Sequence, residues 1–181
     1  MIESKVLCGK KYPLLDIFDG VQPPRKTFCL FEYTKKDLVV SFECYHDGKL
    51  KCPYTQKNSP VYRGDCVEVF ISVGNNQEEY FEIDLAANNV LFCAKIHRQG
   101  EEIIPLESGE IQTYTKIGDV KFEAMLKIPF SFLGENSLNA LYLNTFRVDC
   151  YTGDRVSYAL FPTGEKSHHV PSAFGRLTEK D

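Results

Sequence analysis

The chain has 181 residues, of which 43% are hydrophobic and 25% charged, and its formal net charge is −4. These values fit one soluble globular domain over residues 1–181, and the acidic balance argues against a protein that binds nucleic acid through its phosphates. No stretch is apolar for long enough to cross a bilayer, and the N-terminus lacks the features of a signal peptide, so we expect a cytoplasmic protein with no membrane partner.

Apolar and polar residues alternate between clusters of turn residues, and this pattern predicts strands along the first half of the chain. The expected strands cover residues 28–33, 38–45, 65–73, 80–85 and 90–96. Residues 34–37 should close a hairpin, and the polar stretch 51–62, which contains Pro53 and Pro60, should be a long loop. We expect the charged stretch 98–110 to be irregular.

The second half of the chain continues the pattern. The expected elements are two hairpin strands at 111–117 and 120–128, one helical turn at 129–134, and two further strands at 141–151 and 155–161. Roughly ten short strands with closely spaced turns predict an all-β fold, an antiparallel β-sandwich of the immunoglobulin-like kind. No repeat or flexible linker divides the chain, so we expect a single domain.

Seven cysteines are scattered along the chain without a C-x-x-C pair or a short metal-ligand spacing. An odd number of cysteines in a chain without an export signal indicates reduced thiols. Several of them, such as Cys44 and Cys93, fall within apolar strand patterns. We therefore expect them to be buried as small hydrophobic residues rather than to take part in redox chemistry.

The segment 60–73 carries the most information about function. Tyr62 and Arg63 stand in a loop that runs into a strand, where valine and isoleucine at alternate positions leave Glu68 on the other face. An outward carboxylate beside a mobile aromatic ring suits a flat, hydroxylated and neutral ligand such as a sugar. The alternative is an exposed glutamate and a tyrosine packed on the sandwich edge. Both interpretations place Tyr62 and Glu68 outside the core.

Strand pairing predicts a second carboxylate next to the first. A symmetric hairpin around residues 74–78 sets Glu68 opposite Asp84 and Glu82 opposite Phe70. Two carboxylates side by side on a sheet repel each other, so a cation, an arginine or ligand donors must offset them. Arg147 is a candidate for this role. The alternative is that Arg147 forms a purely structural pair with an acidic residue.

Six segments in this order resemble the carbohydrate-binding modules of family 9, which belong to the wider group of DOMON-like sandwiches. They are residues 62–71, 80–85, 122–130, 143–149, 161–164, and 169–171 together with 174–177. The first of them contains Val67-Glu68-Val69-Phe70-Ile71, which is similar to the family's V-E-V-F-I signature. The resemblance runs from about residue 28 to residue 177.

The resemblance implies a non-catalytic β-sandwich that holds a sugar between two aromatic side chains. The ligand would be a glucan- or xylan-type oligosaccharide or chain end, in the context of carbohydrate catabolism, and bound calcium would have a structural role. Tyr62 matches the first aromatic residue, Glu68 the sugar-binding carboxylate, and His169 a late histidine near the rim of the site.

The chain departs from the family's pattern at the aromatic residues, because the family typically uses tryptophan and this chain has none. The second aromatic position falls near Tyr158 and Phe161, and a strict alignment places it on Leu160. If Leu160 occupies the position, the aromatic clamp is broken.

Other polar residues near these motifs are further candidates for ligand contacts. Arg63 adjoins Tyr62, and Asn88 lies on the loop after the strand of Asp84, where it could equally be a plain turn residue. His168 and His169 are adjacent, so within a strand they would point to opposite faces and could not chelate one metal. Sequence alone leaves the presence of any metal open.

Three functions compete on these observations. A non-catalytic sugar-binding module is the first, and a scaffold domain whose sugar site has decayed is the second. A glycoside hydrolase is the third, because Glu68 and Asp84 would lie about 5 Å apart; a flat sheet face, however, excludes water poorly. A haem role, known in the wider group, would need Met1 or Met125 as a thioether ligand.

Overall fold

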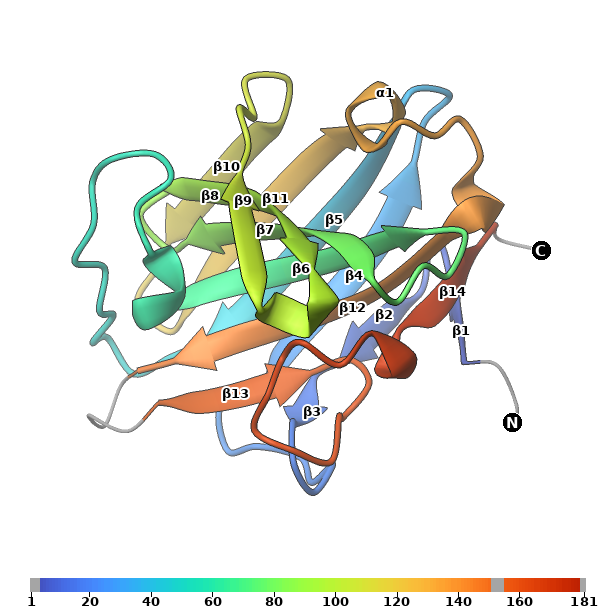
Figure 1. Ribbon diagram of the computed structural model, residues 1–181. Coiled ribbons are helices and arrows are strands. Elements are labelled where there is room, and N and C mark those ends of the chain that lie inside the picture. Colours follow the sequence, from blue (N-terminus) through green and yellow to red (C-terminus); the bar gives the residue numbers. More distant parts are fainter. Residues whose placement is uncertain (1–3, 151–154, 180–181) are drawn as a thin grey trace.

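Two β-sheets lie one behind the other in the computed structural model, which describes residues 4–150 and 155–179 (Figure 1). The larger sheet has nine strands. In spatial order they are β1 (Lys5–Leu7), β14 (Gly175–Thr178), β12 (Leu141–Asp149), β6 (Cys66–Val73), β7 (Glu79–Ala86), β8 (Leu91–His97) and β9 (Glu102–Pro105), with β13 (Val156–Ala159) beside β12 and β3 (Leu15–Asp16) beside β13.

The smaller sheet has five strands. Their spatial order is β10 (Gln112–Ile117), β11 (Lys121–Pro129), β5 (Asp37–Tyr45), β4 (Thr27–Tyr33) and β2 (Lys11–Pro13). Short helical turns connect the strands. They are η1 (Val61–Arg63), η2 (Arg98–Gly100), α1 (Phe130–Leu133), η3 (Leu138–Ala140) and η4 (Pro171–Ala173). None of the described helices is long and apolar enough to span a membrane.

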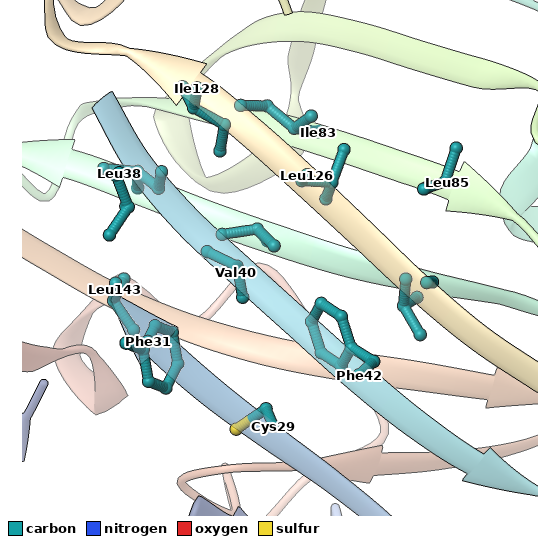
Figure 2. Packing of buried hydrophobic residues seen from close by; sticks show 14 of the residues in the cluster. Cys29, Phe31, Leu38, Val40, Phe42, Ile83, Leu85, Leu126, Ile128 and Leu143 are labelled. Carbon is teal, nitrogen blue, oxygen red and sulfur yellow. The ribbon is translucent and has the colours of Figure 1, made fainter. Parts of the chain in front are cut away.

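The main core lies between the two sheets, where alternate residues of facing strands meet (Figure 2). Phe31 and Phe42 project from β4 and β5, and Ile83 and Leu143 project from β7 and β12. Alternation places every second side chain of these strands in this layer. The predicted β-sandwich is therefore confirmed, together with the hairpin from β4 to β5 and the single α-helical turn.

A second hydrophobic cluster covers the other face of the nine-stranded sheet, which the sequence predicted to be wet. Phe70 of β6, Tyr80 of β7 and Phe146 of β12 lie there under Val61 of η1 and Phe174. The segment that follows β13 (red in Figure 1) folds back and packs on this face. The prediction that Glu68 lies outside the core is thus wrong, because loops and turns add a third layer above its strand.

The observed strands differ from the predicted ones mainly at the edges. The stretch 98–110 contains β9, which pairs with β8, and the short strands β1, β2, β3 and β14 were not expected. The strand predicted for 141–151 ends at Asp149, and residue 151 lies outside the described residues. Strands of two to four residues give too little alternation to be recognised in sequence.

Candidate functional site

A cavity of about 260 Å³ opens on the covered face of the nine-stranded sheet. Its lining comes from β6, β7, β9, η1 and the segment around residue 167. The lining residues are Tyr62, Glu68, Phe70, Glu82, Ile103, Arg155, Lys166, Ser167, His168 and His169. Three of the residues that the sequence selected, Tyr62, Glu68 and His169, thus meet in one place. Their role as ligand contacts stays a prediction.

Glu68 and His168 form the buried base of this cavity. Oε2 of Glu68 lies 2.5 Å from Nδ1 of His168, and the imidazole stacks on Phe146 with the ring centroids 4.5 Å apart. Glu68 is only 1% exposed. Burial by itself would raise the pKa of Glu68, but the positive charge and hydrogen bond of His168 outweigh it and leave the pKa below its usual value. The carboxylate is therefore ionised and held in one orientation.

Two more carboxyl groups lie on the same sheet face. Asp84 stands directly opposite Glu68 and Glu82 opposite Phe70, so the predicted register is confirmed. Burial and the charge of Glu68 raise the pKa of Glu82 to about 8. Burial, with Glu82 and Glu68 as neighbours, also raises the pKa of Asp84 well above its usual range. Repulsion between the three is thus relieved by protonation.

Glu82 and Asp84 differ in their access to the cavity. Glu82 lines it, and its Oε2 atom is buried without a hydrogen-bond partner among the described residues. Asp84 is fully buried and does not line the cavity. The structure therefore does not place Asp84 where it could contact a ligand in this cavity, although the sequence predicted this contact. A protonated Glu82 can donate one hydrogen bond and accept another, as a sugar hydroxyl requires.

His169 also lines the cavity. Its Nδ1 atom lies 2.8 Å from the hydroxyl of Tyr80, and its ring packs on Phe70 at a centroid distance of 5.3 Å. Burial lowers the pKa of His169, which favours the neutral imidazole. The ring passes so close to η2 that a Cβ on Gly100 would lie 2.9 Å from it. Packing thus fixes the position of the His169 ring.

Tyr62 is the aromatic side chain at the rim. It is half-buried on η1, and its ring meets Phe92 edge to face, with the centroids 5.6 Å apart. The proposed second aromatic partners lie elsewhere. Tyr158 is buried and donates a hydrogen bond to Asp149, while Phe161 packs against Gly175 and its backbone bonds to Asn144. Neither lines the cavity.

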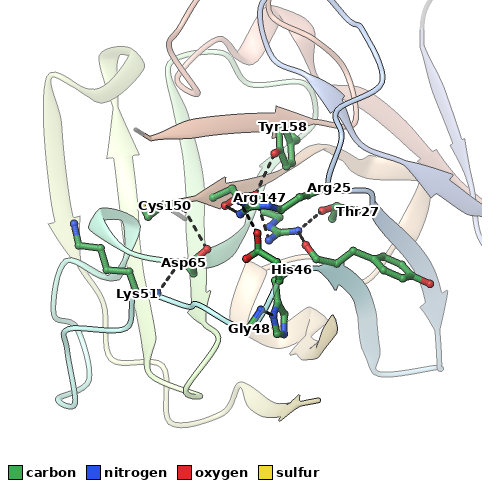
Figure 3. Close-up of polar contacts among 12 residues, drawn as sticks. Arg25, Thr27, His46, Gly48, Lys51, Asp65, Arg147, Cys150 and Tyr158 are labelled. Atoms are coloured by element: carbon green, nitrogen blue, oxygen red, sulfur yellow. Dashed lines mark hydrogen bonds and ion pairs between the residues drawn. The ribbon is translucent and has the colours of Figure 1, made fainter. Parts of the chain in front are cut away.

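Arg147 lies on the face of the sheet opposite to Glu68, so the prediction that it offsets Glu68 and Asp84 is wrong. It pairs across strands with Val67, whose side chain points into the main core. Figure 3 shows its guanidinium among Thr27, Tyr158 and Arg25. Nη1 donates to Thr27 Oγ1 and to the carbonyl oxygen of Tyr45, and Asp149 lies 3.5 Å from Nη2. The alternative interpretation, in which Arg147 forms a purely structural pair with an acidic residue, therefore describes its role.

Arg63 and Asn88 also lie outside the cavity. Arg63 is exposed at the end of η1 and is not among the lining residues. Asn88 is exposed and donates a hydrogen bond to the carbonyl oxygen of Tyr54 at 2.8 Å, which braces the loop.

Sequence reasoning missed several lining residues. His168 escaped notice as the partner of Glu68 because it lies outside any strand pattern. Lys166 lies in an irregular segment that carries no periodicity, and Ile103 lies on the unexpected β9. Arg155 begins the strand predicted at 155–161, directly before β13, and was not selected as a site residue. Only Glu82 had a signal, since the predicted register placed it on the face of Glu68.

The structure offers no support for the calcium that the resemblance implied. Over residues 4–150 and 155–179, no group of three or more His, Cys, Asp or Glu side chains is arranged to hold a metal ion.

Known proteins resemble the chain in fold but not detectably in sequence. No protein-family model matches it, and neither does any curated protein. A protein described as carbohydrate-binding from Bacteroides uniformis aligns with a TM-score of 0.78 and 14% identity over 98% of this chain and 97% of its own.

Two solved structures of a family 9 carbohydrate-binding module from Caldicellulosiruptor kristjanssonii are also similar. The complex with cellotriose has a TM-score of 0.67 and 15% identity, covering 98% of this chain and 93% of that one. The complex with glucose has a TM-score of 0.62 and 14% identity, with 97% and 95% covered. The β-sandwich of this chain is therefore similar to that of the family 9 modules.

Proposed function

We propose that the chain acts as one module that binds a saccharide without altering it, in the cavity between Tyr62 and His169. One observation carries the proposal: a half-buried aromatic ring lines the same cavity as a fixed, ionised Glu68 and a protonated Glu82. The ring offers an apolar face to the C–H side of a sugar, and the carboxyl groups offer an acceptor and a donor to its hydroxyls.

The ligand we propose is a neutral glucose- or xylose-type ring at the end of an oligosaccharide. A cavity of about 260 Å³ lies at the small end of ligand sites, which favours one ring rather than a long chain. The similarity of fold to modules solved with cellotriose and glucose supports this choice. Such a module would keep a partner enzyme near its polysaccharide.

Titration calorimetry with glucose, cellotriose and xylotriose tests the proposal. We expect heat of binding with at least one of these sugars and competition between those that bind, because they share one cavity. The absence of heat with all three would overturn the proposal and leave the scaffold domain with a decayed site.

A glycoside hydrolase is the second candidate, and one observation favours it. Glu68 and Glu82 line the same cavity with pKa values shifted in opposite directions, which is the pattern of an ionised carboxylate and a general acid. Against it, Glu68 is almost fully buried, with one oxygen on His168 and the other 3.7 Å from Sγ of Cys66. We therefore propose that Glu68 binds rather than attacks.

The two candidates separate in an assay with chromogenic aryl glycosides. A binding module releases no more aglycone than buffer does. Release that disappears in Glu82→Gln, while the variant remains folded, would instead favour the hydrolase.

A further inference from the structure

A second cavity adjoins the first one, and the two share a wall of basic residues. It has a volume of about 360 Å³ and is lined by Phe18, Val156 and Ser157, among others. Arg155 and Lys166 line both cavities. A ligand longer than one ring would therefore pass from the first cavity to the second along these two cations.

An exposed aromatic ring supplies an apolar surface in the second cavity. Phe18 is 61% exposed, in a turn that Asp16 fixes through hydrogen bonds from the backbone N–H groups of Phe18 and Asp19 to Oδ1. The turn is therefore a defined support for the ring. A large exposed ring beside a cavity presents the kind of face on which sugars stack.

The basic wall makes no ion pair within the part of the chain that the structure describes. No ion pair among the described residues involves Arg155 or Lys166. The only carboxylate in the lining of the second cavity is Asp16, and its Oδ1 atom already accepts hydrogen bonds in the turn of Phe18. Within the second cavity two cations thus meet a single carboxylate, one oxygen of which serves the turn. From the first cavity, the charge of Arg155 also acts on Glu68 and Glu82.

The loop that carries Lys166 is held against the second cavity. The backbone N–H groups of Thr163 and Gly164 donate to the carbonyl oxygen of Ile17, at 2.9 Å and 3.2 Å. Oγ1 of Thr163 lies 2.8 Å from the carbonyl oxygen of Glu165 and 3.1 Å from that of Ser167, so the backbone is braced on both sides of Lys166. The charge of Lys166 is therefore presented from a fixed backbone.

We propose that the second cavity is a subsite for an anionic sugar unit, so that the preferred ligand carries an acidic sugar next to the neutral ring. The inference rests on the proposed function, because the neutral ring in the first cavity brings the acidic unit to the second. Arg155 suits a carboxylate, since its planar fork can form two parallel hydrogen bonds, and Lys166 adds a point charge. A uronic acid is the simplest sugar with this chemistry.

Matched disaccharides test the subsite. Calorimetry should compare glucose, a neutral glucose disaccharide, the same disaccharide with glucuronic acid as its second unit, and its sulfated form. We expect the uronate to bind roughly tenfold more tightly than the neutral disaccharide at low salt. The advantage should shrink in about 0.5 M NaCl, because exposed cations are screened.

Two variants test whether the tighter binding of the uronate depends on Arg155 and Lys166, and whether disaccharide binding depends on the ring of Phe18. The double substitution Arg155→Gln and Lys166→Gln should bring the ratio of uronate to neutral affinity close to one. Phe18→Ala should weaken both disaccharides and leave glucose binding unchanged. Arg63→Gln is the matched control, because Arg63 is exposed but lines neither cavity, and it should preserve the ratio.

The outcomes separate this proposal from the function on which it rests. If no sugar binds, including glucose, the proposed function fails. If glucose and the neutral disaccharide bind but the uronate and the sulfated form bind no better, the subsite is wrong. An equal gain for both anionic forms assigns the subsite to any sugar anion, and a gain confined to the uronate assigns it to the carboxylate.

Discussion

His168 and Glu68 are 100 positions apart in the sequence, and their side chains meet at 2.5 Å beneath the candidate sugar cavity. Both are buried, so the carboxylate of Glu68 depends on His168 in place of water. The pair therefore links the segment after β13 to the centre of the nine-stranded sheet. It also holds the carboxylate in the orientation that a ligand would meet.

Removing one member of this pair should destabilise the protein. Glu68→Ala leaves His168 buried without its partner, and we expect a loss of about 3 kcal/mol in the free energy of unfolding. Urea denaturation at pH 7 measures it. Glu78→Ala, an exposed glutamate in the turn before β7, is the control and should change little. An unchanged midpoint for Glu68→Ala would show that the acid lies outside the folded core.

Tyr62→Ala should separate binding from stability. The ring is half-exposed and packs edge to face on Phe92, so its loss should cost about 1 kcal/mol of stability but weaken sugar binding by tenfold or more. Calorimetry and thermal unfolding measure the two effects. Tyr33→Ala is the control, because Tyr33 is 41% exposed on β4, on the other sheet. Equal affinities for Tyr62→Ala and wild type would remove Tyr62 from the site.

The raised pKa of Glu82 predicts that the protein loses stability as the pH rises from 4.5 to about 8. Between its usual value of 4.5 and about 8, the folded protein keeps a proton that the unfolded chain releases. The free energy of unfolding should therefore fall as pH rises through this window. The buried Asp84 has a raised pKa as well and acts in the same direction. Urea titrations from pH 5 to about pH 8.5 follow the effect.

The variant Glu82→Gln tests whether the carboxyl group of Glu82 causes this fall in stability. Glutamine has no titrating carboxyl group, so the fall in stability between pH 5 and about pH 8 should be smaller than in wild type. Glu78→Gln, which alters an exposed group, should retain the full fall. If Glu82→Gln and wild type share the same pH dependence, the proton is bound elsewhere.

The sequence predicted the local pairing of the site because hairpins are local. The turn at 74–78 sets the register of β6 against β7, and the opposition of Glu68 and Asp84 followed from it. Alternation also showed correctly that Glu82 shares their face. These relationships depend only on neighbouring strands and on a side-chain period of two.

The covering of that face could not be predicted in the same way. Alternation tells which residues share a face, but it does not tell what lies above the face. The segment that carries His168 and Phe174 has no periodic pattern and acts through a contact distant in sequence. A glutamate opposite an apolar stripe therefore appeared exposed, although the structure buries it.

The error for Arg147 has a related cause. The strands β12 and β6 are neighbours in space but are not joined by a hairpin, so the sequence does not fix which residues of the two strands pair. The pairing of Arg147 with Val67, rather than with Glu68, turns its side chain into the main core. A shift of one residue decides between the two faces.

Arg147→Lys tests this placement. Lysine lacks the fork that reaches both Thr27 and the carbonyl oxygen of Tyr45, so we expect a loss of about 2–3 kcal/mol in stability. Sugar affinity of the folded variant should be unchanged, because Arg147 lies on the other side of the sheet. Arg63→Lys is the exposed control. A stable Arg147→Lys protein with impaired sugar binding would return Arg147 to the site.

Gly100→Ala should damage the site from outside its lining. Gly100 has a φ of +95°, which disfavours a side chain, and its added Cβ would lie 2.9 Å from the His169 ring. We expect a stability loss of about 1–3 kcal/mol from backbone strain and a displaced His169 that weakens sugar binding severalfold.

Gly74→Ala is the matched control for this last change. Gly74 also has a positive φ, of +66°, but no atom lies within 4 Å of its added Cβ. Gly74→Ala should show only the loss of stability that comes from backbone strain, with normal sugar affinity. Thermal unfolding and calorimetry on both variants separate strain from displacement. Normal binding by Gly100→Ala would mean that the position of His169 does not matter to the ligand.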